Sequence, residues 1–359
     1  MKSLRRDLRN WVAASPALRW MLPPLATFRE ALRLHWKTFG CVARVILPLL
    51  LSTGKRPVLF SRYVGLGDVI CTFPAALELK KRHPGATFIY SCHPDSACLP
   101  GMGGVTELVA PFRANFLKKY WRFLFAAVYQ FEYGDDRAFY VSSEILIEAF
   151  CRQFGVPGDG EHPRLHVSAG VRDRMRAVLV KKGVVNGPII LLHPGPSWPI
   201  REWPRKDWSN LAGQFAAHGY QHIMELGSGQ HPHTGKIENP ALPATLSLVN
   251  QLTLEESIAL IEISDLLIGI DSGLLHIAAS LRKPALGLFG PTTPRLRFSP
   301  KSSCSFIISD VECQGCHHRI PCIHWITNCP HDIRCMKNIP VAAVLRASLA
   351  MLAKQAESV

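Results

Sequence analysis

The sequence of 359 residues has no apolar run long enough to cross a bilayer, and it has no recognisable export signal. Its most apolar segment, residues 45–51, lies more than forty residues into the chain, follows Arg44 and contains Pro48. No A-x-A cleavage site comes after it. These absences argue against a membrane-spanning helix and against a secretory signal. We therefore expect a cytoplasmic protein, in which the 11 cysteines remain free thiols.

Acidic residues are scarce at the start of the chain. Residues 1–57 hold 11 Lys and Arg but only Asp7 and Glu30, so nine of the fourteen net positive charges lie there. Because the rest of the chain is only mildly basic, a nucleic-acid channel along the whole protein is excluded, and we expect no nucleic-acid partner. The pattern favours a basic appendage, which we place at residues 1–56.

The appendage has the periodicity of amphipathic helices. Apolar residues recur at three- and four-residue spacing in residues 4–12 and again in residues 25–39, with arginines and lysines between them. Such helices lie in the interface of an anionic membrane, which predicts a peripheral protein on the inner face of the plasma membrane. The alternative is that the apolar faces pack on the globular part of the chain.

From residue 57 onward, short apolar strands alternate with helices in two successive series. The strands are predicted at residues 57–62, 87–90, 105–109, 188–192, 221–226, 246–249, 266–270 and 285–289. The helices are predicted at residues 69–82, 143–154, 171–182, 207–217, 254–263 and 274–281, the fifth behind a Thr253–Glu256 capping box.

This alternation predicts an α/β protein with two doubly wound, Rossmann-like domains that face each other across a cleft. We place the first domain at residues 57–185 and the second at residues 186–340, with a hinge at residues 186–188. A C-terminal helix over residues 341–359 follows.

The most distinctive stretch is residues 264–292. A strand stops at Asp271, and a helix resumes after Gly273, so the loop between them aims backbone N–H groups and the positive end of the helix dipole at whatever lies above the sheet. Ser272 adds a hydroxyl, and Gly273 lets a ligand approach the backbone. This predicts a site for an anion such as a diphosphate. The alternative is an ordinary helix start, with Ser272 as N-cap and Asp271 bonded to loop amides.

A second loop, Gly65-Leu66-Gly67-Asp68, follows the first strand. A dinucleotide fingerprint needs a third glycine where Ile70 stands, so that function is excluded. The loop instead places the carboxylate of Asp68 at the carboxyl end of a strand, facing the expected cleft. As an alternative, Asp68 is the N-cap of the next helix.

Three motifs occur in a fixed order along the chain. They are G-x-G-D at residues 65–68, H-P-G-x-S at residues 193–197 followed by R-E-W-P at residues 201–204, and D-S-G-L-x-H-x-A-A at residues 271–279 followed by G-x-F-G-P-T at residues 287–292. Together they resemble the signatures of glycosyltransferase family 9, the bacterial heptosyltransferases, over residues 57–340. The resemblance implies the GT-B architecture and an inverting transfer of a sugar, heptose by family default, from an ADP-linked donor to a lipopolysaccharide-type or other glycan acceptor.

The resemblance also implies roles for individual residues. Asp68 matches the family's proposed general base, with Gly65 and Gly67 in its acceptor-side loop. The departing diphosphate is expected to meet the N–H groups of residues 272–274 (Ser272, Gly273 and Leu274) and the cation of Arg201. These groups stand where other transferases use a metal ion, and the absence of a D-x-D element agrees with metal-independent transfer, so we expect no cofactor.

Four further residues complete the expected donor side, namely Ser197, Gln230, Asp271 and His276. His276 lies one turn beyond Ser272 and either touches the donor or packs in the core. The family often has lysine in place of Arg201, and many members carry a ribose-binding glutamate after the strand that ends near Gly227. Here Gln230 or His231 must substitute, which leaves the nucleotide and the sugar open.

Two alternatives to a transferase remain. One is a protein that binds nucleotide sugars without turnover, which the presence of Asp68 disfavours. The other is a sugar-nucleotide epimerase of the same architecture, which the D-S-G-L-x-H string disfavours.

Five cysteines lie close together near the C-terminus, at positions 313, 316, 322, 329 and 335. The spacing of Cys313 and Cys316 is that of a zinc knuckle, which with Cys322 and Cys329 would make four ligands. The later spacings lack a second close pair, so the alternatives are packed thiols or a loop on the substrate side.

Overall fold

The structure is a computed structural model of the chain. It describes residues 40, 42–63, 65–110, 122–131, 144–196, 198–228, 230–231, 235–236, 241–319 and 329–357. The predicted amphipathic segments at residues 4–12 and 25–39, together with Ser197 and Cys322, lie outside the described residues.

The second half of the chain forms a parallel sheet of six strands, whose order is β8-β5-β4-β9-β10-β11. The strands are β4 (Ile189–His193), β5 (His222–Glu225), β8 (Leu246–Ser247), β9 (Leu266–Ile270), β10 (Ala285–Phe289) and β11 (Cys304–Ile308). In order along the chain this is 3-2-1-4-5-6, the doubly wound order, and it reverses between β4 and β9. Ligands of such sheets bind outside the carboxyl ends of the strands at this switch point.

The first half forms a smaller parallel sheet with the order β2-β1-β3. Its strands are β1 (Val58–Ser61), β2 (Phe88–Ser91) and β3 (Ala127–Gln130). The predicted strand at residues 105–109 is reduced to a single bridge between Val109 and Tyr90, because the Thr106 hydroxyl donates to the Phe88 carbonyl in place of a ladder bond. The reversal in this sheet lies between β1 and β3.

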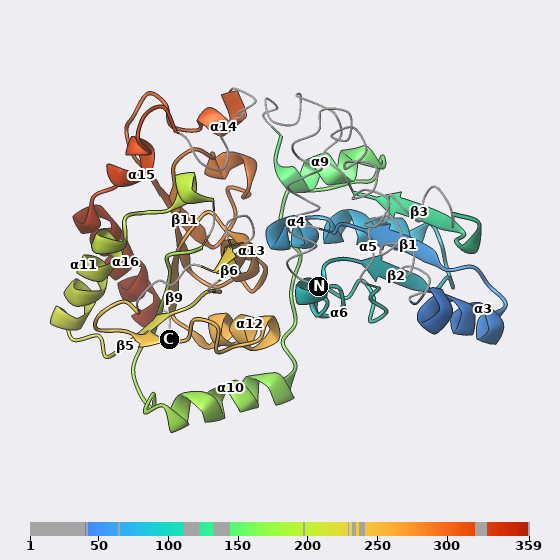
Figure 1. Cartoon of the computed structure of the whole chain (residues 1–359), viewed down its shortest axis with the longest axis horizontal. Coiled ribbons are helices and arrows are strands. Elements are labelled where there is room, and N and C mark those ends of the chain that lie inside the picture. The colour runs from blue at the N-terminus through green and yellow to red at the C-terminus, as the bar shows by residue number, and fades with distance from the viewer. Residues whose placement is uncertain are drawn as a thin grey trace, which may run out of the picture.

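Helices cover both faces of the second sheet, and the residues of its strands alternate between them. Ile190 and Leu192 face α11 (Arg205–Ala217) and α16 (Val341–Ala356), whereas Leu191 belongs to the core under α12 (Leu254–Ile263) and α13 (Gly273–Ser280). Figure 1 shows α11 and α16 on the side that faces away from the first sheet, and α12 and α13 on the side toward it.

Most helices begin and end close to the predicted positions. The capping box before α12 is confirmed, because Glu256 N–H donates to Thr253 Oγ1 (3.2 Å) and Thr253 N–H donates to Glu256 Oε2 (2.8 Å). The helix predicted at residues 69–82 is two helices, α4 (Leu66–Cys71) and α5 (Phe73–Lys81). Pro74 causes the break, since it lacks an N–H and its ring clashes with the preceding turn.

The chain passes from one sheet to the other earlier than expected. After α9 (Leu146–Gln153), residues 156–168 form neither helix nor strand, and α10 (Ala169–Lys181) packs against α12 of the second half. An ion pair of 2.7 Å between Arg172 Nε and Glu262 Oε2 joins these two helices. The expected hinge at residues 186–188 therefore follows a helix that packs with the second sheet, and the crossing lies at residues 156–168.

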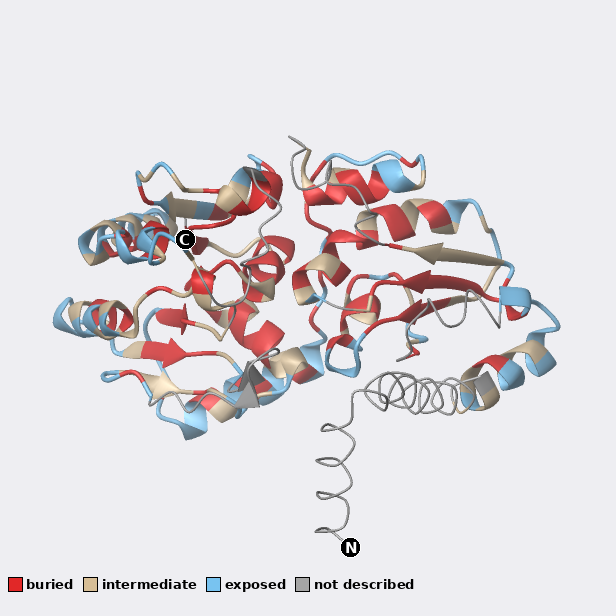
Figure 2. Ribbon diagram, turned by 45° about the horizontal axis from the view of Figure 1, so that its top comes forward, coloured by how far each residue is buried: buried red, intermediate tan, exposed pale blue. Residues whose placement is uncertain are grey.

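The two halves share one apolar core. Val69 and Ile70 of α4 and Leu274 and Ile277 of α13 belong to the same buried cluster, and α4 and α13 are in contact. Figure 2 shows buried residues on both sides of this junction. The helices that follow the carboxyl ends of β1 and β9, namely α4 and α13, therefore pack directly on each other.

The last part of the predicted appendage packs on the first sheet. A π-helical turn, η1 (Val42–Ile46), leads into α3 (Leu47–Thr53), and Ile46 is buried against Leu59 and Ile89. Among the described helices, none combines the length and hydropathy that a membrane span needs. The shorter elements are α6 (Leu99–Met102), α14 (Cys316–Arg319), α15 (Arg334–Lys337), β6 (Gln230–His231), β7 (Gly235–Lys236), η2 (Pro94–Ser96), η3 (Arg122–Leu124), η4 (Pro199–Arg201) and η5 (Pro294–Leu296).

Candidate functional site

Asp68 lies at the switch point of the first sheet, in the first turn of α4. Its carboxylate accepts a charge-assisted hydrogen bond of 2.7 Å from Arg62 Nη2, and Arg62 Nη1 donates to the Phe131 carbonyl at the end of β3. Arg62 thus joins the ends of two strands and holds the carboxylate between them. The alternative of Asp68 as an N-cap is wrong, because Gly65 occupies that position and no side chain caps the helix.

Arg62 was not among the predicted site residues. It directly follows β1 and lies six positions before Asp68. A basic residue so close to a loop that carries a carboxylate could have been predicted to form an ion pair with it. The Asp68 side chain keeps a fifth of its surface (20%) exposed, whereas that of Arg62 keeps 7%. Arg62 therefore contacts the carboxylate from the protein interior, and part of the Asp68 side chain stays accessible to solvent.

The glycines of the two loops are explained by the contact between α4 and α13. A Cβ on Gly67 would overlap the ring of His276, and a Cβ on Gly273 would lie 2.6 Å from Leu66 Cδ2. Gly65 has φ +84°, and a Cβ there would overlap the Asp68 carboxylate. Close packing between the two halves therefore requires glycine at positions 67 and 273, whereas the positive φ and the Asp68 carboxylate of its own loop require it at position 65.

Ser272 stands at the start of α13, at the switch point of the second sheet. It has the N-cap position, but its side chain makes no capping bond, so the N-cap alternative for its hydroxyl is wrong. Its Oγ is buried and has no hydrogen-bond partner within the described part of the chain. A buried hydroxyl without a hydrogen bond costs free energy, so we expect a ligand to supply the missing hydrogen bond.

Asp271 is bonded to side chains, not to loop amides as the alternative had it. Its Oδ2 accepts from Thr292 Oγ1 (2.6 Å) and pairs with Arg201 Nη1 (3.3 Å). Burial alone would raise the pKa of Asp271, but the charges of Arg201 and Arg297 and the Thr292 hydrogen bond lower it from 3.8 to about 2.

Arg201 and Arg297 make this part of the site cationic. Arg201 lies on η4, with its guanidinium carbon 3.8 Å from the centre of the Trp198 ring, and its side chain is 12% exposed. Arg297 is buried and was not predicted, although two arginines, 295 and 297, follow the G-P-T element. The guanidinium groups of Arg201 and Arg297 both act on the carboxylate of Asp271, so positive charge is concentrated here, where an anion would be stabilised.

His276 lies in a buried cluster at the junction. Its Nδ1 is 2.7 Å from His162 Nε2 and 3.5 Å from Cys71 Sγ, and its ring stacks on Phe298. Burial is the main cause that lowers the pKa of His276, to about 4, and it also lowers that of His162. Both rings are therefore neutral at neutral pH, and one donates its N–H to the other.

This cluster joins three parts of the chain, because Cys71 ends α4, His162 lies in the crossing segment and His276 lies on α13. Among the described residues, these three are the group whose ligand atoms come close enough together to hold a metal ion. Two imidazoles on one tetrahedral zinc ion would have nitrogens about 3.3 Å apart, so the observed 2.7 Å is the distance of an N–H···N hydrogen bond. Neither Cys71 nor His162 carried a signal in the sequence, since isolated cysteines and histidines are common in cores.

Side chains of the H-P-G-x-S and R-E-W-P motifs hold the loop that carries Arg201 in place through hydrogen bonds. His193 Nδ1 donates to the Leu226 carbonyl (2.9 Å), which ties the end of β4 to the end of β5. Trp203 Nε1 donates to the Ile339 carbonyl (3.1 Å). Ser197 lies outside the described residues, and only the backbone of Gln230 is described, in β6, so neither is placed at the site.

The cysteine segment packs on the G-P-T loop. Gly315 N–H donates to the Gly290 carbonyl and His317 N–H to the Pro291 carbonyl, and the His317 ring lies 5.4 Å from that of Trp198. The segment therefore lies on the loop beside Arg201, and a role on the substrate side stays a prediction.

The zinc site stays a prediction. Burial, and after it the nearby Cys313, Cys316 and Cys329, raises the pKa of Cys335 to about 12, so these thiols lie near one another. Their sulfurs do not come within ligand distance of each other as a group among the described residues, and Cys322 is not described.

The model of glycosyltransferase family 9 (heptosyltransferase) matches residues 108–323 of this chain. Lipooligosaccharide heptosyltransferase 2 of Haemophilus influenzae is 33% identical over 131 residues, which cover 35% of this chain and 37% of that protein. Lipopolysaccharide heptosyltransferase 2 of Salmonella typhimurium is 30% identical over 138 residues, 37% of this chain and 39% of that protein. The chain thus matches less than half of the length of these relatives.

Solved structures resemble a larger part of the chain. The dodecameric iron-containing glycosyltransferase TibC of enterotoxigenic E. coli superposes with a TM-score of 0.63 at 19% identity, over 84% of this chain and 79% of that one. ADP-heptose lps heptosyltransferase II of E. coli gives 0.56 at 18% identity, over 83% and 99%. The likeness confirms the predicted α/β fold with parallel sheets.

Proposed function

Because the chain belongs to glycosyltransferase family 9, we propose that it transfers a sugar from a nucleoside-diphosphate donor to a lipopolysaccharide-type glycan. One observation carries the proposal: the switch points of two parallel sheets meet through α4 and α13, with a carboxylate on one side and a cationic, anion-accepting loop on the other. Such a pair supplies what glycosyl transfer needs, a base for the acceptor and a stabiliser for the leaving group.

Asp68 acts as the base on the acceptor side. As the acceptor oxygen attacks the anomeric carbon, the carboxylate takes up its proton, and Arg62 holds the carboxylate in one orientation through the 2.7 Å bond. The direct attack from the face opposite the departing diphosphate inverts the anomeric centre.

The start of α13 and the two arginines act on the donor side. The N–H groups of the first turn, the Ser272 hydroxyl and the helix dipole bind the diphosphate, and Arg201 and Arg297 balance the negative charge that grows as the bond to the sugar breaks. No step in this scheme requires a metal ion.

His276 completes the donor side as a neutral group. Its Nδ1 is engaged by His162, so the ring orientation is set before a ligand arrives. With Nδ1 accepting from His162, the other ring nitrogen carries a proton that it can donate to the donor.

The donor is an ADP-linked sugar, with heptose as the default of the family. TibC has been solved in complex with ADP-D-beta-D-heptose, and several relatives are named heptosyltransferases. The acceptor is a glycolipid, which agrees with a protein that sits on the inner face of the plasma membrane through its basic N-terminal residues.

A panel of nucleotide sugars tests the function. With a core-glycan acceptor present, an ADP-linked heptose should bind and release ADP, whereas UDP- and GDP-linked sugars should not. Binding without release in every case would identify a nucleotide-sugar-binding protein instead, and isomerised nucleotide sugar without any acceptor would identify an epimerase.

A shortened chain tests the membrane attachment. Since Ile46 packs in the core of the first half, only residues 1–39 should be removed, not the whole segment to residue 51. The shortened protein should stay folded and bind anionic vesicles more weakly than the full chain, and added salt should weaken the binding of both.

A further inference from the structure

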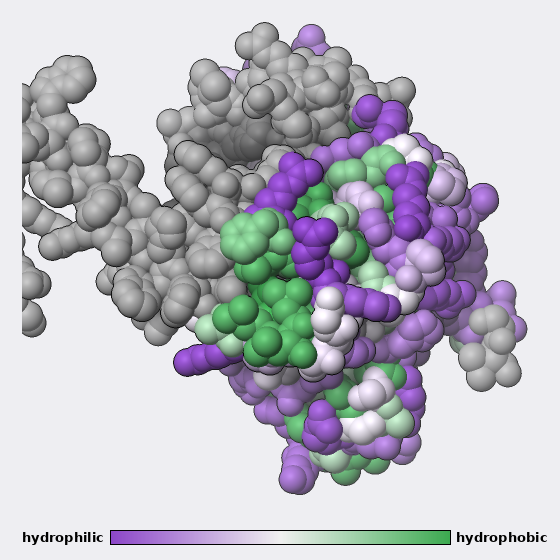
Figure 3. Space-filling view, turned by 90° about the vertical axis from the view of Figure 1, so that its right-hand side faces the viewer, coloured by the Kyte–Doolittle hydropathy of each residue, from purple (hydrophilic) through white to green (hydrophobic). Residues whose placement is uncertain are grey.

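One end of the first half carries exposed apolar side chains next to arginines. Leu47 and Leu51 are one helical turn apart on α3, with 42% and 85% of their surfaces exposed, and Phe123 on η3 is 65% exposed. The two elements belong to one place, because Arg56 Nη1 donates to the Phe123 carbonyl (3.4 Å) and residues of both share a buried cluster. Figure 3, which views the molecule from this end, shows a hydrophobic patch bordered by hydrophilic side chains.

The charged side chains that α3, η3 and the segments next to them contribute, within the described residues, have one sign. Arg44, Lys55, Arg56 and Arg122 are all exposed, and none of them forms a salt bridge with another described residue. Residues 42–63 and 122–131 contain no aspartate or glutamate. The surface of an anionic bilayer attracts such a basic border, with about 1 kcal/mol for each Lys or Arg close to it.

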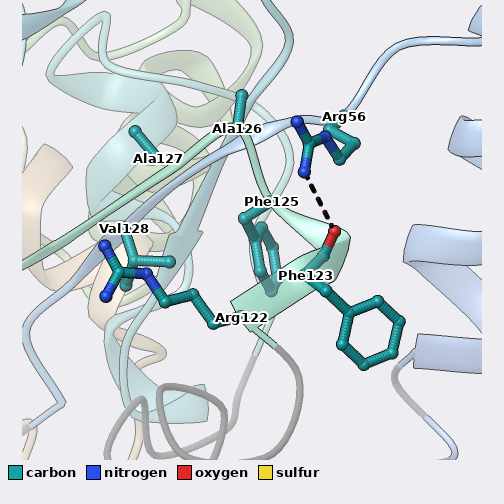
Figure 4. A pocket seen from close by; sticks show the side chains of 7 residues that line it. All are labelled: Arg56, Arg122, Phe123, Phe125, Ala126, Ala127 and Val128. Carbon is teal, nitrogen blue, oxygen red and sulfur yellow. Dashed lines mark hydrogen bonds between the residues drawn. The ribbon is translucent and has the colours of Figure 1, made fainter.

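A cavity of about 360 Å³ lies within the same surface. It is lined by Arg56, Arg122, Phe123, Phe125 and the first residues of β3. Figure 4 shows the guanidinium groups of Arg56 and Arg122 on opposite sides of the Phe125 ring, with the Phe123 ring directed away from them. The two guanidinium groups can bind the phosphate of a lipid, and the phenylalanine and alanine side chains between them can contact the upper part of its acyl chain.

The position of this surface leaves the transfer site open. Arg56 precedes β1, and the cavity lies against residues 126–128 at the start of β3, so the surface is at the amino ends of these strands. Asp68 follows the carboxyl end of β1, and the start of α13 follows the carboxyl end of β9. The transfer site therefore lies at the opposite ends of the strands from this surface. A membrane bound at one end therefore does not block the other.

We propose that this surface, the α3 patch (Leu47, Leu51, Phe123, Arg44, Lys55, Arg56 and Arg122), docks on an anionic lipid bilayer. Leu51 and Phe123 enter the interface between headgroups and acyl chains, and the arginines bind lipid phosphates. The proposal rests on the proposed function only for its purpose, which is to bring the transferase to a lipid-linked acceptor; lipid binding itself does not depend on catalysis.

The test uses the full chain and measures cosedimentation with vesicles of mixed phosphatidylglycerol and phosphatidylcholine, and with vesicles of phosphatidylcholine alone. Binding to the mixed vesicles should fall about tenfold or more in R56Q/R122Q, since each basic residue near an anionic surface contributes about fivefold. Leu51→Ser with Phe123→Ser should weaken binding by a similar factor through the loss of apolar contact.

Two matched variants serve as controls. Val180→Ser with Val185→Ser changes two exposed valines near the end of α10, and Arg346→Gln with Lys354→Gln removes two exposed charges of α16. Both should bind vesicles like the wild type. Melting temperatures of all variants should match that of the wild type, because every changed side chain is exposed.

Vesicle binding that is unchanged in both α3-patch variants would overturn the proposal. So would a wild-type oligomer that these variants dissociate without a change in vesicle binding, because the patch would then join copies of the chain. Nucleotide release with a detergent-solubilised acceptor should be unaffected by the variants. If the wild type releases no nucleotide from any donor, the proposed function fails, while the vesicle result still stands or falls by itself.

Discussion

Two ion pairs, one on each side of the junction, define the site at the level of single residues. Arg62 with Asp68 and Arg201 with Asp271 each set a guanidinium against a carboxylate near the carboxyl end of a strand. The two pairs differ in the positive charge around the carboxylate, because Arg297 is a second cation near Asp271. The side of Asp271 is therefore suited to an anion, and the side of Asp68 to a proton transfer.

Asp68→Asn separates catalysis from structure when it is compared with Arg62→Gln. Both variants break the ion pair and should cost about 1 to 3 kcal/mol of the free energy of unfolding. Only Asp68→Asn removes the base, so its turnover should fall at least about a hundredfold, with nucleotide affinity unchanged. The measurements are initial rates, nucleotide titration and urea unfolding.

Arg62→Gln keeps the carboxylate, and its turnover should therefore fall much less than that of Asp68→Asn. If the two variants lost turnover equally, the ion pair itself and not proton transfer would be what the reaction needs. If Asp68→Asn kept its turnover, the base would lie elsewhere.

Arg201→Ala should weaken nucleotide binding and turnover together, because a charge-assisted contact to the diphosphate strengthens as the leaving group departs. Arg201→Lys keeps the charge and should retain most of the affinity, with a smaller loss from the altered geometry. Calorimetric titration with ADP compares the two. Equal ADP affinity in wild type and Arg201→Ala would show that Arg201 does not contact the diphosphate.

At the level of elements, the contact between α4 and α13 depends on glycine. Gly67 leaves room for the His276 ring, and Gly273 leaves room for Leu66. The two motif loops, far apart in the sequence, thus fit into each other. A methyl group at either position would separate the base from the anion-binding loop.

Gly67→Ala should lower the free energy of unfolding by about 1 to 3 kcal/mol through overpacking at this contact. In a His276→Ala background the same change should cost far less, because the ring that meets the new methyl group is gone. Gly213→Ala is the control: no atom of another residue lies near that position of α11, so it should stabilise the helix by about 0.5 to 1 kcal/mol. Thermal melts of the variants provide the readout, and an undiminished cost in the double variant would contradict the contact.

At the level of the whole molecule, neutral histidines join the two halves. His162 in the crossing segment bonds to His276, and Arg282 Nη2 donates to the His162 carbonyl (3.0 Å). Because burial disfavours the charged form of both rings, the junction is sensitive to acid. The halves are therefore held together best at neutral pH.

The stability of the protein should fall as the pH drops from about 6.5 toward 4. In that range the unfolded chain binds a proton at His276 that the folded chain, with a pKa of about 4, does not bind, so the equilibrium shifts toward unfolding by up to about 3 kcal/mol. Urea midpoints at about pH 7.5 and about pH 5.5 measure the loss. His162→Gln should show a smaller loss, because it removes a second buried titrating ring, whereas the exposed control His331→Gln should behave like the wild type. Equal losses in all three proteins would show that the His162–His276 pair does not govern the acid response.

The sequence by itself determined most of the elements and the two loops, although β3 and β11 were not among the predicted strands. Apolar runs of strand length, the Thr253–Glu256 box and the strand-loop-helix pattern around Asp271 depend on neighbouring residues, so they could be predicted at nearly the right positions. The order of the three motifs was also enough to identify the family. Local signals of this kind exist before the chain folds.

The tertiary structure decided what each motif residue touches. The partners of Asp68 and Asp271, the packing of His276 on His162 and Cys71, and the placement of α10 with the second sheet all join residues from different elements. Arg297 and His162 carried no pattern of their own, because a single buried polar residue gains its role only from the groups that folding brings to it. Contacts across long sequence separations follow from the packing of whole sheets and helices, and local periodicity does not encode them.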